Sequence, residues 1–195
     1  MVDNICFWCV GDQVYEEYHN NEWGRRCYND YELFEKISLE VFQGGLSWIT
    51  ILKKRDNFKM AFTNFDFYQV AEYKDSKVYS LLSDSSIIRH KGKILATINN
   101  ARCAIELVKE FGSISNFLYS FTILDKKNRP SESESLLRSY NNESVIISNK
   151  LKERGWKFIG PKNTYALMQS IGIVNDHIEG CFVGDTIESQ GSCDE

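Results

Sequence analysis

Two cysteines and two histidines near opposite ends of the sequence could bind a metal ion. Cys6 and His19 lie near its start, and His177 and Cys181 form a His-x3-Cys pair near its end. Two thiolates and two imidazoles make a closed tetrahedral set for zinc, with no ligand position left for water. We therefore predict a structural zinc site that ties the two ends of the chain together.

Cys9 leaves this ligand set open, because the spacing Cys6-x2-Cys9 is also typical of zinc sites. Cys9 could replace His19 in a Cys3His site. The sequence contains six cysteines but no export signal, so metal binding or burial is favoured over disulfides. We expect Cys27, Cys103 and Cys193 to be free cysteines.

Glu40 is a carboxylate in an apolar helical stripe. It lies seven residues after Leu33 and three after Ile37, and Val41 follows it. A buried acid is usually paired or hydrogen-bonded, and an unpaired one commonly marks a ligand site. An ion pair with a neighbouring Lys or Arg and a ligand-binding role are equally consistent with this pattern.

Aromatic residues gather in the sequence around His19 and after Glu40. Tyr15, Tyr18 and Trp23 surround His19, and Trp48 follows Glu40 across a glycine turn. Aromatic residues at helical spacing are more often core than pocket. Combined with a carboxylate, however, they could form a receptor for a flat cation.

Helical periodicity predicts the elements that position these residues. Asn29 or Asp30 can begin a helix that ends at Gly44, and a second helix should start near Ser47. Further helical patterns cover residues 92–110 and 113–121, and another closes at Gly155. A polar stretch over residues 125–144 is typical of a long loop. Few turn dipeptides and only two prolines favour an all-α fold.

A short hairpin is predicted after Gly155, with a tight turn at residues 160–163 and a helix over 164–171. Free backbone N–H groups and the positive end of the helix dipole at such a helix start can hold a phosphate. An ordinary helix–helix turn has the same spacing.

The net charge of −4 argues at first against a nucleic-acid partner. The charge is unevenly distributed, however. Residues 184–195 carry four acids and no base, whereas residues 145–163 and 85–109 are rich in Lys and Arg. The two basic regions could bind DNA or be solvated helix faces. We expect one compact domain over residues 1–183, in which two helical lobes are possible, followed by a polar acidic tail over 184–195.

The hydrophobic content of 43 % is sufficient for a large core, and no apolar run is long enough to span a membrane. We expect a cytoplasmic protein that is monomeric and makes no membrane contact.

Several ordered blocks of this sequence resemble the bacterial 3-methyladenine-DNA glycosylase I family of the helix-hairpin-helix superfamily. The resemblance spans about residues 6–181 and rests on segments 18–24 (YHNNEWG), 45–50 (GLSWIT), 53–55 (KKR), 87–90 (IIRH), 154–161 (RGWKFIGP) and 174–177 (VNDH). It implies a helix-hairpin-helix glycosylase fold, one structural zinc and no organic cofactor. It also implies that the zinc ligands are Cys6, His19, His177 and Cys181, not Cys9.

The resemblance implies a DNA repair activity that hydrolyses the N-glycosidic bond of 3-methyladenine in double-stranded alkylated DNA and releases the free base. Glu40 would be the catalytic carboxylate. The substrate-binding positions would be Tyr18, Trp48, Trp23, Tyr15 and Trp8, and the DNA-binding positions Leu46, Gly160, Lys162 and Thr164. Leu46 would fill the gap left by an everted nucleotide.

Asn175 stands where the superfamily usually has a catalytic aspartate, two residues before the histidine. A base that is already cationic leaves as a neutral group, so modest catalysis should suffice. Phe7 and Val41 depart from the family, in which small residues are common, and their bulk is expected to narrow the pocket. A non-catalytic binder of damaged DNA or of a nucleobase, built on the same zinc scaffold, is the alternative function.

Overall fold

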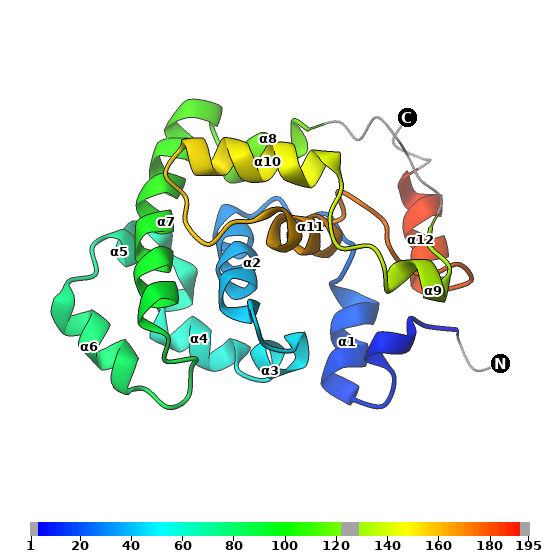
Figure 1. Ribbon diagram of the computed structural model, residues 1–195, viewed down its shortest axis with the longest axis horizontal. Helices are drawn as coiled ribbons and strands as arrows, with labels where there is room; N and C mark the ends of the chain where they lie inside the picture. The colour runs from blue at the N-terminus through cyan, green and yellow to red at the C-terminus, as the bar shows by residue number, and fades with distance from the viewer. Residues whose placement is uncertain (1–3, 122–128, 192–195) are drawn as a thin grey trace.

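A computed structural model describes residues 4–121 and 129–191, and within these ranges the chain is helical and contains no strand (Figure 1). The all-α prediction is confirmed for this part of the chain. The elements are η1 (Phe7–Cys9), α1 (Gln13–Asn21), α2 (Asp30–Gln43), α3 (Trp48–Leu52), α4 (Arg55–Ala61), η2 (Thr63–Phe65), α5 (Phe67–Ala71), α6 (Asp75–Ser83), α7 (Lys91–Phe111), α8 (Ile114–Tyr119), α9 (Glu132–Ser135), α10 (Asn142–Glu153), α11 (Pro161–Ser170) and α12 (Phe182–Gly191).

Helix α2 is the central helix, and all residues from Leu33 to Phe42 are buried. Its start is fixed by Asn29, whose side chain accepts hydrogen bonds from the backbone N–H groups of Tyr31 and Glu32. A helix that is buried all round lies inside a core, and α2 packs against α7, α8 and α11. Any polar residue on α2 between Leu33 and Phe42 is therefore held away from solvent.

Two hydrophobic cores meet at α3. The larger is built around α2, α4, α5, α7 and α11, and the smaller includes Cys6, Tyr18, Trp23 and Cys181. Trp48 packs against both cores. The smaller core joins the beginning and the end of the described chain, which lie on the same side of the molecule (Figure 1).

Part of the expected acidic tail is helical, because residues 184–191 belong to α12. Arg129 pairs with Asp185 and with Glu188, and the backbone N–H of Phe182 donates to the Asn4 carbonyl at 3.1 Å. These contacts use the acids of α12 to fasten it to the rest of the fold. Residues 192–195, including Cys193, lie outside the described residues.

The hairpin differs from its prediction in one respect: α11 starts at Pro161 rather than at Thr164. Proline suits the first helical position, where its missing N–H needs no partner. The turn therefore lies before Gly160, and it uses positive φ angles at Gly155 (84°) and Phe158 (57°).

The long loop is shorter than the predicted range of residues 125–144. Helix α9 interrupts it and α10 already begins at Asn142, while residues 125–128 lie outside the described part. Among the described residues, no helix combines the length and apolarity needed to cross a bilayer.

Candidate functional site

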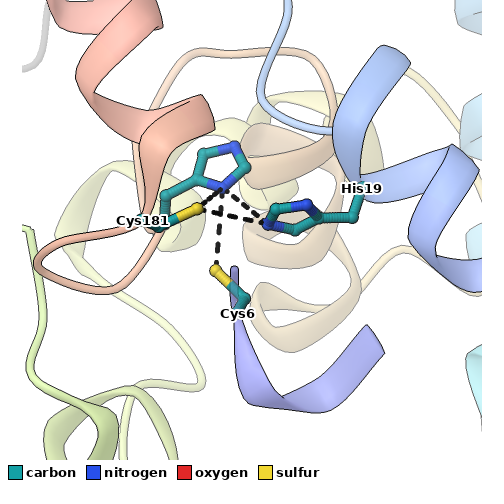
Figure 2. Close-up of side chains that lie close together, drawn as sticks. Cys6, His19 and Cys181 are labelled. Atoms are coloured by element: carbon teal, nitrogen blue, oxygen red, sulfur yellow. Dashed lines mark hydrogen bonds between the residues drawn. The ribbon is translucent and has the colours of Figure 1, made fainter. Parts of the chain in front are cut away.

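The predicted metal ligands come together in the smaller core. Cys6, His19, His177 and Cys181 are fully buried, and their ligand atoms all lie within 4.8 Å of one another. Figure 2 shows Cys6 on the N-terminal segment, His19 on α1 and Cys181 before α12 pointing toward one another. Segments at opposite ends of the chain therefore supply one compact donor set.

The distances within this cluster are close to those of a tetrahedral ion site. Zinc at about 2.3 Å from sulfur and about 2.0–2.1 Å from nitrogen separates its ligand atoms by roughly 3.3–3.8 Å. The observed separations are 3.7 Å for Cys6 Sγ–His177 Nδ1, 3.5 Å from Cys181 Sγ to each imidazole, and 3.1 Å between His177 Nδ1 and His19 Nε2. The donor chemistry fits the ion, and the three sulfur–nitrogen separations fall in this range, whereas the two imidazole nitrogens lie slightly closer together.

Neighbouring acceptors orient both imidazoles. His177 Nε2 lies 3.3 Å from the Trp23 carbonyl oxygen, and His19 Nδ1 lies 2.7 Å from Asn20 Oδ1. Each outer nitrogen can therefore donate its proton, which leaves the inner nitrogen as a lone-pair donor. Cys9 is not one of the four clustered residues, and its thiol donates to the Cys6 carbonyl at 3.0 Å.

Glu40 is a buried carboxylate without a direct polar partner. Its residue is 5 % exposed, and neither a hydrogen bond nor an ion pair of its side chain occurs among the described residues. Burial raises its pKa to about 8, opposed by the positive charge of Lys36 one helical turn earlier. Of the two interpretations left open by the sequence, the ion pair is absent from the described structure, and the unpaired acid remains.

Tyr18 and Trp48 form the aromatic surroundings of Glu40. Their ring centroids are 5.5 Å apart with the planes tilted by 48°. Burial, and next the negative charge of Glu40, raise the pKa of Tyr18 well above its ordinary value, so Tyr18 keeps its proton as a hydrogen-bond donor. The indole Nε1 of Trp48 is buried and has no partner among the described residues. The site therefore contains an acid, Glu40, and an N–H donor, Trp48, whose polar groups have no hydrogen-bond partner among the described residues.

A buried ion-pair network lies next to this site, and it was not predicted from the sequence. Lys36 is 6 % exposed and pairs with Glu22, which also pairs with Arg55, and Arg55 Nε donates to Glu35 at 2.6 Å. Lys36 Nζ also lies 5.9 Å from the centroid of the Tyr18 ring. The lysine beside Ile37 in the apolar helix indicates a buried charge that needs a partner, but the sequence does not indicate which residue pairs with it.

The hairpin borders an open groove of about 600 Å³. Its lining includes Gly160, which the sequence predicts to contact DNA, and also His90, Lys93 and Asn163. Glu40, Tyr18 and Trp48 do not line this groove. The carboxylate site is therefore not part of the hairpin groove.

The predicted DNA-contact residues differ in exposure. Leu46 is 38 % exposed on the turn after α2, and Lys162 is exposed in the first turn of α11. Thr164, by contrast, is only 1 % exposed, so its side chain faces inward. Helix geometry leaves the backbone N–H groups of Lys162 and Asn163 without intrahelical acceptors.

Comparison with known proteins gives the family. A model of the methyladenine glycosylase family matches residues 8–184. The chain belongs to the methyladenine glycosylase family. DNA-3-methyladenine glycosylase 1 of Escherichia coli (strain K12) is 40 % identical to it over 176 residues, which cover 90 % of this chain and 94 % of the relative. The DNA-3-methyladenine glycosylase of Haemophilus influenzae (strain ATCC 51907 / DSM 11121 / KW20 / Rd) is 36 % identical over 184 residues, with coverages of 90 % and 95 %.

Solved structures agree with this membership. A crystal structure of 3-methyladenine DNA glycosylase I superposes with a TM-score of 0.86 at 40 % identity, over 92 % of this chain and 98 % of that chain. A Staphylococcus aureus structure that describes the basis of 3-methyladenine recognition has a TM-score of 0.87 at 29 % identity, over 94 % and 98 %. The predicted resemblance is confirmed, and the all-helical fold is that of the family.

Within this methyladenine glycosylase, the three remaining predicted pocket aromatics lie around the cluster of Cys6, His19, His177 and Cys181. Trp8 packs edge-on against His19 (centroids 5.2 Å apart) and Trp23 (4.9 Å), and Trp23 packs on His177 (4.5 Å). Tyr15 packs on Trp8 at 4.9 Å, and burial, followed by the charges of Cys9 and Glu40, raises its pKa. Tyr15 thus lies between the cluster and the carboxylate.

Asn175 and the neighbouring Asp176 use their side chains in contacts within the protein. Asn175 donates to the Gly184 carbonyl and accepts from the His177 backbone N–H. The next residue, Asp176, accepts from Tyr165 at 2.5 Å and pairs with Arg138 at 2.9 Å. Asn175 has no carboxylate and that of Asp176 is engaged, whereas the Glu40 carboxylate has no partner among the described residues.

The two departures from the family pattern lie at different places. Phe7 is partly buried against the smaller core, and Val41 is buried in the larger one, where it lines the hairpin groove. The bulk of Val41 therefore faces the groove.

Proposed function

We propose that this chain hydrolyses the N-glycosidic bond of 3-methyladenine in double-stranded alkylated DNA and releases the free base. Membership in the methyladenine glycosylase family supports the proposal, as do the names of both relatives. The observation that carries it is Glu40, an unpaired carboxylate buried beside Tyr18 and Trp48.

Charge provides the selectivity. Methylation at N3 makes the base cationic in the nucleotide, whereas ordinary adenine is neutral. Near neutral pH burial keeps a proton on Glu40 in the free protein, and a cation in the pocket favours the ionised carboxylate, so the damaged base displaces that proton and is then attracted by the charge and by the aromatic faces. An unmodified, neutral base does not displace the proton and gains no attraction of charge.

The reaction begins with eversion of the damaged nucleotide from the duplex. The base stacks on Trp48, a contact worth about 1–3 kcal/mol, and Glu40 and Tyr18 hydrogen-bond to its edge. Tyr15, Trp23 and Trp8 complete the aromatic wall. The bond between the sugar carbon and the base nitrogen then breaks, its electron pair leaves with the base, which becomes neutral, and water bonds to the sugar carbon and releases a proton to solvent.

No lysine is needed as a nucleophile, and the proposed reaction is monofunctional. The two buried lysines of the described chain are both engaged, since Lys36 pairs with Glu22 and Lys93 donates to two backbone carbonyls. We expect the protein to act as a monomer.

On the DNA, Leu46 would enter the stack in place of the everted nucleotide. Gly160, Lys162 and the open backbone N–H groups at the start of α11 would hold a phosphate. Thr164 would support this segment from the inside, since its side chain is buried.

One zinc ion per chain, held by Cys6, His19, His177 and Cys181, would complete the scaffold. The tetrahedral spacing and the outward hydrogen bonds of both imidazoles support this proposal. With four protein ligands the ion leaves no position for substrate, so its contribution is stability.

The decisive experiment measures free 3-methyladenine released from methylated duplex DNA by the purified, metal-loaded protein. Multiple turnovers are expected. A protein that retains the lesion without releasing it would instead be the non-catalytic binder, and one that ignores methylated DNA would be neither.

A further inference from the structure

The C-terminal end of α2 is fastened by side chains from two other helices. The last carbonyls of a helix have no intrahelical partner. Here Lys93 Nζ from α7 donates to the Phe42 carbonyl at 2.8 Å and to the Gly44 carbonyl at 2.6 Å. Asn163 Nδ2 from α11 donates to the Glu40 carbonyl at 3.1 Å. The helix that carries the buried acid thus depends on both neighbours for its final turn.

Lys93 is an unusual residue for this task. It is 7 % exposed and has no carboxylate partner among the described residues. Its ammonium group meets the negative end of the α2 dipole, which favours a cation there. Ending a helix does not require a buried charge, because the two glycines after α2 can end it unaided. The cost of burying Lys93 points to a further role in holding the turn beyond the helix.

That turn presents Leu46. Leu46 N donates to the Gln43 carbonyl at 2.7 Å, and the Gln43 side chain donates back to the Leu46 carbonyl at 3.0 Å. A Cβ added to Gly44 would lie 3.8 Å from Lys93 Nζ and 4.0 Å from Asn163 Nδ2. The same two donors therefore flank the base of this turn.

Both donors also line the groove of the hairpin, together with Gly44, Gly160 and His90. His90 accepts a hydrogen bond from the Lys93 backbone N–H, and this bond fixes the start of α7. The hairpin, the first turn of α7 and the Leu46 turn are joined as one hydrogen-bonded unit.

We infer that Lys93 and Asn163 are positioning residues that fix the Leu46 turn and the end of α2 relative to the DNA-binding hairpin. A phosphate held at the hairpin then places Leu46 against the duplex in register with the pocket of Glu40. Neither residue contacts the base. The inference rests on the proposed glycosylase function and assigns to it two residues outside the pocket.

The test compares binding of the free base with excision of the base from duplex DNA. Lys93→Met keeps the length of the side chain but removes the donor. We expect kcat/KM for excision from methylated duplex DNA to fall by about 30-fold or more, because small displacements of such groups are costly. The Kd for free 3-methyladenine, measured by calorimetry, should stay within about twofold of the wild-type value because the pocket is intact.

Lys91→Met is the matched control. It removes the same charge two residues earlier on α7, from an exposed side chain that has no bond to α2. Excision should then fall by no more than about threefold, and the loss should diminish as salt is raised. Asn163→Ala, which removes a smaller group, should reproduce the selective loss in milder form even if Lys93→Met folds poorly.

Three outcomes overturn the inference. The first is equal excision by Lys93→Met and Lys91→Met in a protein whose wild type is active, and the second is full duplex activity of Asn163→Ala. The third is a parallel loss of base affinity and excision in Lys93→Met, which would show general damage to the fold. A wild-type protein that releases no base from methylated DNA would overturn the proposed function first, and this inference with it.

Discussion

Two buried polar sites lie side by side in this molecule, and they differ in how their groups are satisfied. In the Cys6 and His177 cluster every polar atom has a neighbour within about 4 Å, and the outer imidazole nitrogens have acceptors. In the neighbouring site Glu40 and the Trp48 Nε1 atom have no polar partner among the described residues.

The difference separates a structural site from a binding site. A closed donor set gains its stability within the protein, so the fold depends on it. An open set costs stability in the free protein, because desolvated groups are left without partners, and recovers that cost when ligand arrives. Removing a group from the first site should destabilise the protein, whereas removing one from the second should stabilise it and lower its activity.

The largest effect is expected for Cys181→Ser. Loss of one thiolate should remove the zinc and lower the free energy of unfolding by roughly 3–5 kcal/mol. Metal analysis and denaturant unfolding measure the two losses. Cys103→Ser, at a half-buried thiol outside the cluster, is the control and should keep its metal. Full stability of a zinc-free Cys181→Ser protein would break the comparison, because the cluster would then contribute nothing to the fold.

The second largest effect is expected for the excision activity of Glu40→Gln. Glu40→Gln retains the shape of the side chain but removes its charge, and the cationic base loses its counter-ion. We expect kcat/KM for excision to fall by about 100-fold, equivalent to roughly 3 kcal/mol. An unchanged rate and base affinity would remove Glu40 from the mechanism. Comparison with Glu35→Gln, at a buried acid that pairs with Arg55, tests whether loss of any buried carboxylate has the same effect.

The same Glu40→Gln variant should be more stable than wild type, in a pH-dependent manner. The folded pKa of Glu40 is about 8, against an ordinary value of 4.5. Between these values the folded protein holds a proton that the unfolded chain releases, so wild-type stability falls as pH rises and levels off above pH 8.

The gain from Glu40→Gln should therefore be near zero at pH 4 and reach roughly 2–4 kcal/mol at pH 8.5. Because both proteins keep the metal cluster, Lys36, Tyr15 and Tyr18, the difference between their unfolding curves isolates Glu40. A gain that is constant with pH would mean that Glu40 is not a destabilised acid.

The sequence predicted the closed site more completely than the open one. The types and spacing of the Cys and His residues gave the candidate ligands, and the family resemblance chose His19 over Cys9 before the geometry was known. Helices with clear caps and apolar periodicity, such as α2 and α7, were predicted to within a residue or two. Helix caps and apolar periodicity depend on residues close together in the sequence.

The features that the sequence could not reveal depend on contacts between distant segments. The engagement of Lys36 by Glu22 and of Lys93 by the end of α2 needs three-dimensional placement. The start of α11 was misplaced because Pro161 can belong to a turn or to a first helical position. Whether Glu40 has a partner could be decided only after its neighbours were known.

The smallest effect is expected for Cys9→Ser, and it sharpens the boundary of the closed site. Cys9 is only 1 % exposed beside the cluster, and its thiol donates to the Cys6 carbonyl. A serine hydroxyl can make the same hydrogen bond, so the free energy of unfolding should change by less than about 1 kcal/mol. The zinc content should stay at one ion per chain. Loss of the metal from Cys9→Ser, together with its retention in His19→Ala, would instead identify a Cys3His site, and the outward bond of His19 to Asn20 would then have no bearing on metal binding.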